Sequence, residues 1–472
     1  MQQVVINVRM RSFLFLLLLS ALLCLPARAE DEQNYIIQVE EPIEEKWILD
    51  GLEPVYEAAG LYRTGDQSIV DALAAEEALT VCEPDHDVVL FDLQEELETL
   101  RGEEWTRAML GADYAASQGL YGEGVKIALI DSGIRPDFAE QTGAAVAQGV
   151  NVLESGEEER KDTSDSIGHG TFAASIIASA AGIAPRAEII PFKCFDSKHT
   201  EVSYVVSAIY TAVDDYHCDI MNLSLGTTDD SLTLRGAIAH AYENGVMMIA
   251  ASGNLEPGTV TTGDDAPYYP AAYDEVISVG AVSAKKQIAR FSVQNQSVWI
   301  TAPGVNVKGL SRTGTSMLTG SGTSYAAPFV TAAAALAVEA DPSLTPAELM
   351  GLFRDTAEDV GDEGFDSAYG YGVMNLGLLL ARVRNDSTSP VLSLCDGTLC
   401  VSVARPGLGT DCELLLARYE RSGRFAGVMT LAKSRGLYAL NNSPLPEIGE
   451  KSFTVFAVEK DTFAPLHVAR KQ

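Results

Sequence analysis

The chain has 472 residues and a formal net charge of −33, with 47% hydrophobic and 21% charged residues. This length predicts about two to four structural units, and the composition is that of a globular protein and not of a disordered one. Because phosphate binding needs basic patches, the acidic balance makes nucleic acid a poor candidate partner. The same charge is typical of a protein that stays soluble outside the cell.

The N-terminus has the pattern of a secretory signal peptide. Arg9 and Arg11 precede an apolar run from Phe13 to Leu25, and Ala27-Arg28-Ala29 is a small-x-small exit. The run is shorter than a comfortable membrane span, and a retained membrane anchor is the alternative interpretation. We therefore expect residues 1–29 to be removed, and we expect no membrane span in the exported remainder.

Residues 30–104 are strongly acidic and predict a small α+β unit. Asn34–Val39 and Val88–Phe91 read as strands, and Ser68–Ala78 between them reads as a helix.

Residues 105–385 alternate apolar, β-prone runs with helical stretches such as Val202–Asp214 and Ser231–Asn244. This alternation predicts an α/β fold, with a parallel sheet covered by helices on both faces. Sites in such sheets form at the carboxyl ends of the strands, so Asp131, Ser224 and Ser252 should gather on one side. The expected strands are Val125–Ile130, Ala187–Phe192, Ile220–Ser224, Val246–Ala250 and Val276–Val279.

Residues 387–472 read as short strands separated by turns, which predicts a small antiparallel, sandwich-like β domain after a linker over Asn385–Pro390. Cys395 and Cys400 flank a predicted tight hairpin. A disulfide between them and two free thiols are equally open interpretations. The spacing of the seven cysteines is not that of a zinc site.

Gly322-Thr-Ser-Tyr-Ala-Ala-Pro328 opens an Ala-rich apolar run. It predicts a loop that enters a buried helix, with Ser324 at the helix start and Pro328 in the first turn. The positive end of that helix suits a nucleophile whose attack generates an oxyanion. An ordinary helix N-cap is the structural alternative.

Two further motifs carry an imidazole and a carboxylate. Gly168-His169-Gly170-Thr171 opens another Ala-rich run, and His is the side chain best matched to exchange a proton near neutral pH. Asp131-Ser-Gly follows the first expected strand, where a carboxylate can orient an imidazole. Alone, the histidine motif also fits a helix cap, and Asp-Ser-Gly also fits a simple turn.

In the order Asp131, His169, Ser324, these motifs resemble the subtilisin-like serine proteases, the subtilase family. The resemblance runs from Trp105 to about Ala381. It rests also on Met221-Asn-Leu-Ser-Leu-Gly226, Ala251-Ser-Gly-Asn254, Tyr269-Pro-Ala-Ala272, Val276–Ala281, Phe291-Ser292, Ala302-Pro-Gly304 and Tyr369-Gly-Tyr-Gly-Val373.

The resemblance implies a secreted serine endopeptidase that acts on protein or peptide substrates through an acyl-enzyme intermediate. Asp131, His169 and Ser324 would form the triad, and Asn254 would stand in the oxyanion hole. Substrate would bind as an added strand. The substrate-binding residues would be Ser224, Leu225, Gly226, Ala251, Ser252 and Gly253, and the open pocket would favour a large apolar residue before the scissile bond.

The chemistry implied by the resemblance requires no cofactor and no metal ligand. Many subtilases carry a longer calcium-binding insertion where this chain has only Gly182-Ile-Ala184, which argues against that site, and a structural calcium elsewhere stays open. Phe172 replaces a frequent second histidine, and Ser252 replaces a usual alanine, at positions that are not catalytic. Glu256 is either a charge at the pocket rim or a solvated carboxylate.

Residues 30–104 resemble the family's propeptide, which assists folding and inhibits the enzyme, and we expect self-cleavage between Leu97 and Trp105. The C-terminal unit is similar to small β domains of surface proteins and is expected to contact the cell wall or the protease itself. An inactive subtilisin-like scaffold is the alternative, but it predicts a broken triad or oxyanion position, and all four residues are present. A nucleotide-binding protein would need a phosphate loop, whose spacing Gly320-Ser-Gly322 does not continue.

Overall fold

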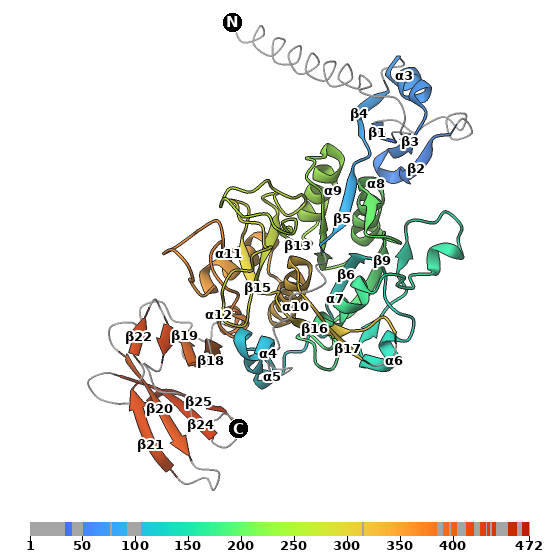
Figure 1. Ribbon diagram of the computed structural model, residues 1–472. Helices are drawn as coiled ribbons and strands as arrows, with labels where there is room; N and C mark the ends of the chain where they lie inside the picture. The colour runs from blue at the N-terminus through green and yellow to red at the C-terminus, as the bar shows by residue number, and fades with distance from the viewer. Residues whose placement is uncertain are drawn as a thin grey trace, which may run out of the picture.

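A computed structural model describes residues 34–39, 51–75, 78–91, 105–313 and 316–384, together with strands between Pro390 and Lys471. Figure 1 shows an N-terminal unit, a central domain and a C-terminal unit following one another along the chain. The predicted signal segment, residues 1–29, lies outside the described residues. Within the described residues, no helix combines the length and the apolar character needed to cross a membrane.

The central domain is built on an eight-stranded parallel sheet, which confirms the predicted α/β class. Its strands are continuous apolar runs because both faces of the sheet are covered. They follow the spatial order β15 (Ile300–Pro303), β14 (Val276–Val282), β13 (Met247–Ala251), β11 (Ile220–Leu223), β6 (Lys126–Asp131), β9 (Glu188–Lys193) and β7 (Ala145–Val146), with β8 (Val150–Asn151) also paired to β9.

Helices pack on both faces of this sheet, as the sequence predicts. Successive residues of β6 point to opposite faces: Ile127 and Leu129 belong to one apolar cluster, and Ala128 and Ile130 belong to the other. The first cluster lies under α7 (His169–Ala178), α10 (Thr323–Ala340), α11 (Pro346–Thr356) and α12 (Leu376–Val383), and the second under α8 (Val202–Tyr210) and α9 (Leu232–Glu243).

The N-terminal unit is a four-stranded antiparallel sheet with one α-helix on it. The predicted helix forms as α3 (Gln67–Ala75), and the small core includes Ile37, Tyr62 and Leu73. The strands follow the spatial order β2 (Glu53–Tyr56), β3 (Leu61–Thr64), β1 (Tyr35–Val39) and β4 (Leu79–Pro84).

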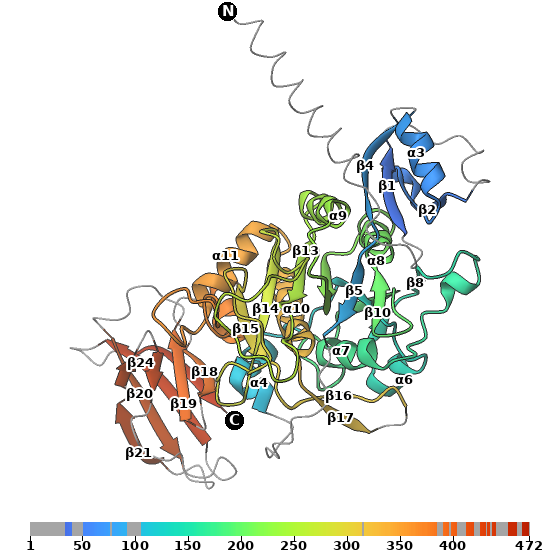
Figure 2. The same cartoon turned by 45° about the horizontal axis from the view of Figure 1, so that its top comes forward.

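The second strand predicted for this unit forms as β5 (Asp87–Leu90), but it does not join the unit's own sheet. It pairs antiparallel with β10 (His199–Glu201) on one side and β12 (Leu225–Gly226) on the other, both from the central domain. Figure 2 shows β5 reaching out of the N-terminal unit toward β10. Local sequence could predict the strand but not its partners, because strand pairing is decided by tertiary contacts.

The C-terminal unit contains two four-stranded antiparallel sheets, which confirms its predicted β character. The predicted hairpin forms between β18 (Pro390–Cys395) and β19 (Thr398–Val403), and its register pairs Cys400 with Ser393 and not with Cys395. Strand β18 lies beside α4 (Trp105–Leu110) and α12 of the central domain. The other strands are β20 (Cys412–Tyr419), β21 (Phe425–Thr430), β22 (Ala432–Ser434), β23 (Leu437–Ala439), β24 (Ser452–Glu459) and β25 (Pro465–Lys471).

Candidate active site

The central sheet aligns the ends of three neighbouring strands. The register pairs Ile130 with Leu223, and Leu223 with Ala250, so Asp131, Ser224 and Ala251 lie side by side at one edge. This is the carboxyl edge, where ligands bind in open parallel sheets.

Asp131 and His169 form a buried pair at this edge. The two carboxylate oxygens of Asp131 lie 2.8 and 2.9 Å from Nδ1 of His169, and both residues are almost fully buried. Asp131 is the last residue of β6, and His169 is the first residue of α7. The contact assigns Nδ1 as the protonated nitrogen, so Nε2 can act as a base.

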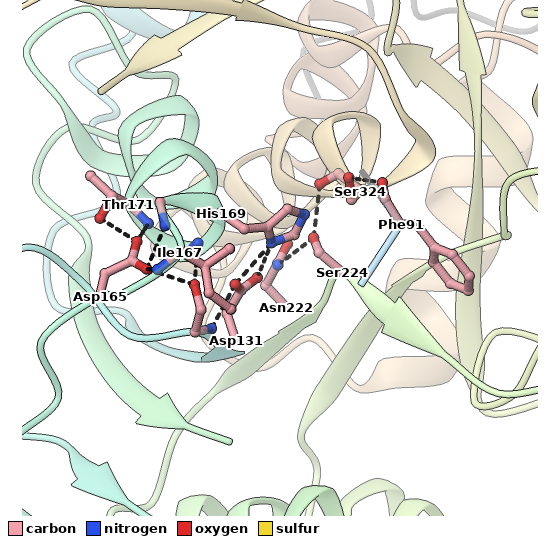
Figure 3. A network of polar contacts seen from close by, with 12 residues as sticks. Phe91, Asp131, Asp165, Ile167, His169, Thr171, Asn222, Ser224 and Ser324 are labelled. Carbon is pink, nitrogen blue, oxygen red and sulfur yellow. Dashed lines mark hydrogen bonds and ion pairs between the residues drawn. The ribbon is translucent and has the colours of Figure 1, made fainter. Parts of the chain in front are cut away.

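Ser324 lies in the first turn of α10, on the other side of the imidazole from Asp131 (Figure 3). Its carbonyl oxygen accepts a hydrogen bond of 2.8 Å from the Ser224 hydroxyl, which itself accepts one from Asn222 Nδ2 at 2.9 Å. Thr331, two turns along α10, donates to Asn222 Oδ1 at 2.8 Å. This buried network ties the start of α10 to the end of β11.

Asn254 presents an amide group to the same place. Its Oδ1 accepts hydrogen bonds from the Thr323 N–H at 3.1 Å and the Thr323 hydroxyl at 2.9 Å, which fixes the orientation of the amide. Its Nδ2 is buried and has no hydrogen-bond partner among the described residues. A side-chain carbon at Gly322 would lie 3.4 Å from this Nδ2 and 3.0 Å from Ser324 Oγ. The amide is therefore positioned to receive an oxyanion formed beside Ser324.

The segment that fills this site comes from the N-terminal unit. Strand β5 is held between β10 and β12, and the residue that follows it, Phe91, accepts a hydrogen bond through its carbonyl oxygen from the Ser324 hydroxyl. An atom added at Gly322 would lie 2.7 Å from the same carbonyl oxygen, so this oxygen, Ser324 Oγ and Asn254 Nδ2 converge. The chain thus presents its own peptide to the site as an added strand.

The side chain of Phe91 occupies an apolar pocket with an aromatic wall. Its ring meets Tyr268 edge to face, with ring centroids 4.9 Å apart. A Cβ at Gly226 would come within 2.7 Å of the Phe91 ring, and a Cβ at Gly253 within 2.3 Å of the Tyr268 ring. Gly226 therefore lets the Phe91 ring approach the backbone, and Gly253 does the same for the Tyr268 ring. The sequence predicted that these two glycines would leave the pocket open.

The predicted substrate-binding residues separate into two groups. Leu225 and Gly226 pair directly with β5, whereas the Ser224 hydroxyl donates a hydrogen bond to the Ser324 carbonyl oxygen and so supports the backbone at Ser324. Ala251 and Ser252 are buried, Ala251 belongs to the apolar cluster that includes Phe91, and the Ser252 N–H donates to the Val279 carbonyl oxygen.

Sequence reasoning missed Tyr268 as a pocket residue, because a tyrosine before Tyr269-Pro270 carries no functional signal by itself. Burial raises the pKa of the Tyr268 phenol, and the carboxylate of Glu256 raises it further. Glu256 therefore lies close enough to influence the phenol. Phe91 was predicted as a strand end but not as an occupant of the site.

Within the described residues, no group of three or more His, Cys, Asp or Glu side chains could hold a metal ion. The structural calcium left open by the sequence gains no support from these residues.

A profile of the subtilase family matches residues 122–372, which include Asp131, His169, Asn254 and Ser324. The chain belongs to the subtilase family. Subtilases are serine-type endopeptidases, and this subtilase has the family fold.

Similar proteins are extracellular or alkaline proteases. Minor extracellular protease Epr of Bacillus subtilis (strain 168) is 35% identical over 279 residues, which are 58% of this chain and 41% of that protease, so this chain spans less than half its length. Subtilisin DY of Bacillus licheniformis is 34% identical over 57% of this chain and 95% of its own. Fervidolysin from Fervidobacterium pennivorans shares the fold, with a TM-score of 0.62. The two are 19% identical, and the match covers 92% of this chain and 72% of fervidolysin.

Proposed function

We propose that this subtilase is a secreted serine endopeptidase that acts through Asp131, His169 and Ser324 and is made as a self-processing proenzyme. One observation carries the proposal: the Ser324 hydroxyl contacts the carbonyl group of a peptide held as an added strand, with the His169–Asp131 pair beside it. Helix capping alone does not account for a peptide carbonyl at Ser324.

The geometry supports the following chemistry. His169 removes the hydroxyl proton as Ser324 Oγ attacks the carbonyl carbon, and Asp131 stabilises the resulting imidazolium. The Asn254 amide and the Ser324 N–H receive the charge that develops on the carbonyl oxygen. His169 then protonates the leaving amine, and water repeats the sequence on the acyl-enzyme to release the acid.

The first substrate is the chain itself. Because the Phe91 carbonyl oxygen accepts a hydrogen bond from the Ser324 hydroxyl, we propose Phe91–Asp92 as the bond that is cut. The cut between Leu97 and Trp105 expected from the sequence stays a prediction, because residues 92–104 lie outside the described residues. We therefore place the end of the inhibitory propeptide at Phe91. Until it leaves, β5 blocks the cleft between β10 and β12.

Secretion is part of the proposal because residues 1–29 have the signal-peptide pattern and similar proteins such as Epr are extracellular proteases. A structural calcium and a contact between residues 387–472 and the cell wall remain proposals that rest on the sequence alone. For the C-terminal unit, the fold supports a different contact, in which β18 lies against α4 and α12 of the central domain.

Labelling with a fluorophosphonate probe tests the nucleophile. Processed wild type is expected to be labelled and to hydrolyse peptides, whereas Ser324→Ala should lose labelling and remain an unprocessed precursor. Labelling that persists in Ser324→Ala would overturn the assignment. Absence of labelling and of processing in the wild type would favour the inactive scaffold.

The scissile bond is tested with a matched pair of variants. Phe91→Asp places a charge in the apolar pocket and should slow processing by about a hundredfold or more, whereas Leu97→Asp should not slow it. N-terminal sequencing of the wild-type product should begin at Asp92. A product that begins after residue 97, or equal slowing by Leu97→Asp, contradicts cleavage after Phe91.

A further inference from the structure

Asp165 is a buried carboxylate in the loop just before α7, outside the triad (Figure 3). Its Oδ1 accepts hydrogen bonds from the N–H groups of Ile167 at 2.9 Å and Gly168 at 2.7 Å, and from the Ser132 hydroxyl at 2.9 Å. Its Oδ2 accepts from the N–H of Thr171 at 2.9 Å and from the Thr171 hydroxyl at 2.6 Å. Both oxygens are therefore committed to the loop and the first turn of the helix that carries His169.

The Ser132 hydroxyl links this carboxylate to the catalytic one. Ser132 donates its hydroxyl to Asp165 and its N–H to Asp131 Oδ1 at 2.7 Å. Its oxygen also accepts the N–H of Gly170 at 3.0 Å. A Cβ at Gly170 would come within 2.2 Å of the Gly133 carbonyl oxygen, so the helix and the loop after β6 lie in close contact. Asp165 thereby fixes how the element carrying His169 sits against the element carrying Asp131.

The charge of Asp165 also acts on the imidazole. His169 is the first residue of α7, and the N-cap residue, Gly168, supplies no side-chain cap. The positive end of a helix disfavours a protonated imidazole, and a carboxylate at that end offsets the effect. Asp165 occupies that place and receives the N–H of Thr171 in the first turn.

We propose that Asp165 is a positioning residue for the Asp131–His169 pair: it holds the two elements in register through Ser132 and, by neutralising the start of α7, keeps His169 basic enough to act near neutral pH. The inference rests on the proposed function, because it concerns the work of His169 as the general base.

Two titratable side chains from other elements face the pair. Tyr325 of α10 lies with its ring centroid 5.6 Å from that of His169. The sulfur of Cys194, the residue after β9, lies 3.7 Å from the Asp131 carbonyl oxygen, and burial raises the pKa of this thiol, so the thiol stays neutral.

The nearby cations do not offset the carboxylate directly. Arg135 is paired with Asp137 through two contacts of 2.5 and 2.7 Å, and Lys193 with Asp196 at 2.7 Å. Arg312, from the segment that joins β16 (Val307–Leu310) and β17 (Met317–Gly320), lies beside the start of α7 with its side chain exposed. Asp165 is thus the carboxylate that contacts the N–H groups at this helix end.

The test compares wild type, Asp165→Asn and Asp162→Asn in the processed full-length enzyme, with kcat and KM measured on a peptide substrate from pH 5 to 9. In Asp165→Asn we expect kcat to fall about tenfold with KM unchanged, and the acid limb of kcat/KM to move down by about half to one pH unit. Asp162 lies in the same loop, is exposed and accepts a hydrogen bond from the Ser164 N–H at 3.0 Å. Its variant should keep the wild-type profile.

If Asp165→Asn lowers the melting temperature but leaves the acid limb of kcat/KM in place, Asp165 is a structural cap only and the proposal is overturned. An upward shift of the acid limb in Asp165→Asn also overturns it. So does an equal shift of the acid limb in Asp162→Asn. If Asp165→Asn does not fold, Ser132→Ala is the deciding variant. It removes the hydroxyl that links Asp165 to the loop of Asp131 and keeps the charge of Asp165. It should therefore lower kcat and leave the acid limb of kcat/KM where it is in the wild type. An unchanged kcat there also overturns the proposal. A wild type without activity or labelling would instead contradict the proposed function itself.

Discussion

Three helices of the central domain begin at a buried carboxylate, but the carboxylates come from different parts of the chain. At α7 it is Asp165, from the loop that leads into the helix. At α8 it is Asp85, which accepts the Ser203 N–H at 3.0 Å and the Ser203 hydroxyl at 2.6 Å. At α9 it is Glu83, which accepts the N–H groups of Leu232 and Thr233 at 2.9 and 2.8 Å.

Glu83 and Asp85 belong to the segment that processing after Phe91 would detach, whereas Asp165 remains. The same physical device, a buried carboxyl group at the start of a helix, would therefore serve two purposes. At α7 it would be permanent and would support the imidazole of His169 in its proposed catalytic role. At α8 and α9 it would hold the proposed propeptide, which has to dissociate after processing, and Arg63, paired with Glu201 at 2.9 Å, adds a further contact.

Glu83→Ala should have the largest effect on this comparison. Glu83 is buried and also accepts the hydroxyl groups of Ser231 at 2.7 Å and of Thr233, so its loss leaves several donors of α9 without a partner. We expect the dissociation constant of the processed complex to rise about a hundredfold, which corresponds to a loss of about 3 kcal/mol of binding free energy. Dilution followed by size-exclusion chromatography measures it.

The matched control for Glu83→Ala is Asp71→Ala. Asp71 is an exposed carboxylate of the same unit that accepts a hydrogen bond from Gln67 within α3, at 2.9 Å. Its removal changes the net charge equally and should leave dissociation unchanged. Equal weakening by both variants would mean that general charge, and not the cap on α9, holds the propeptide.

Thr171→Val tests the permanent cap with a smaller expected effect. The change keeps the shape of a fully buried side chain and removes the hydroxyl that Asp165 accepts at 2.6 Å. We expect a loss of about 1–2 kcal/mol of unfolding free energy in the Ser324→Ala precursor and in the inhibitor-blocked mature enzyme alike. Denaturant unfolding measures both forms, and a loss confined to the precursor would break the distinction between permanent and removable caps.

Sequence reasoning could predict the central domain because its signals are local. The runs that became β6, β9, β11, β13 and β14 are continuous and apolar, as strands covered on both faces must be. The order of Asp131, His169 and Ser324, together with Asn254, could be taken from motifs whose residues the structure brings together.

The contacts that join the two units were not predictable in the same way. Strand β5 was predicted as a strand of the N-terminal unit without a partner, and its hydrogen-bonding edges meet β10 and β12, which lie far along the sequence. Asp165 stands outside the helix it caps, and its role depends on Ser132, which arrives from another loop. Such contacts depend on tertiary packing, which no local pattern encodes.

The removable caps should respond to pH through Asp85. Burial raises the pKa of its carboxyl group from 3.8 to about 6 in the docked state, against the lowering effect of hydrogen bonds from Ser203. A group whose pKa rises on docking favours docking while it is protonated, so its contribution is full below about pH 4 and is lost as the pH rises through 6.

We therefore expect the processed complex to hold its propeptide on the order of tenfold more tightly at pH 4.5 than at pH 6.5, and Asp85→Asn to remove most of that difference. Size-exclusion chromatography of the diluted complex measures dissociation without relying on activity at acid pH. His86 needs its own control, His86→Gln, because its Nδ1 lies 3.6 Å from the carboxylate of Asp229 in the central domain. Tighter binding at pH 6.5 than at pH 4.5 would contradict this expectation. It would show that the Asp85 carboxyl group docks in its charged form, stabilised by the hydrogen bonds from Ser203, as Asp165 is by those from Thr171.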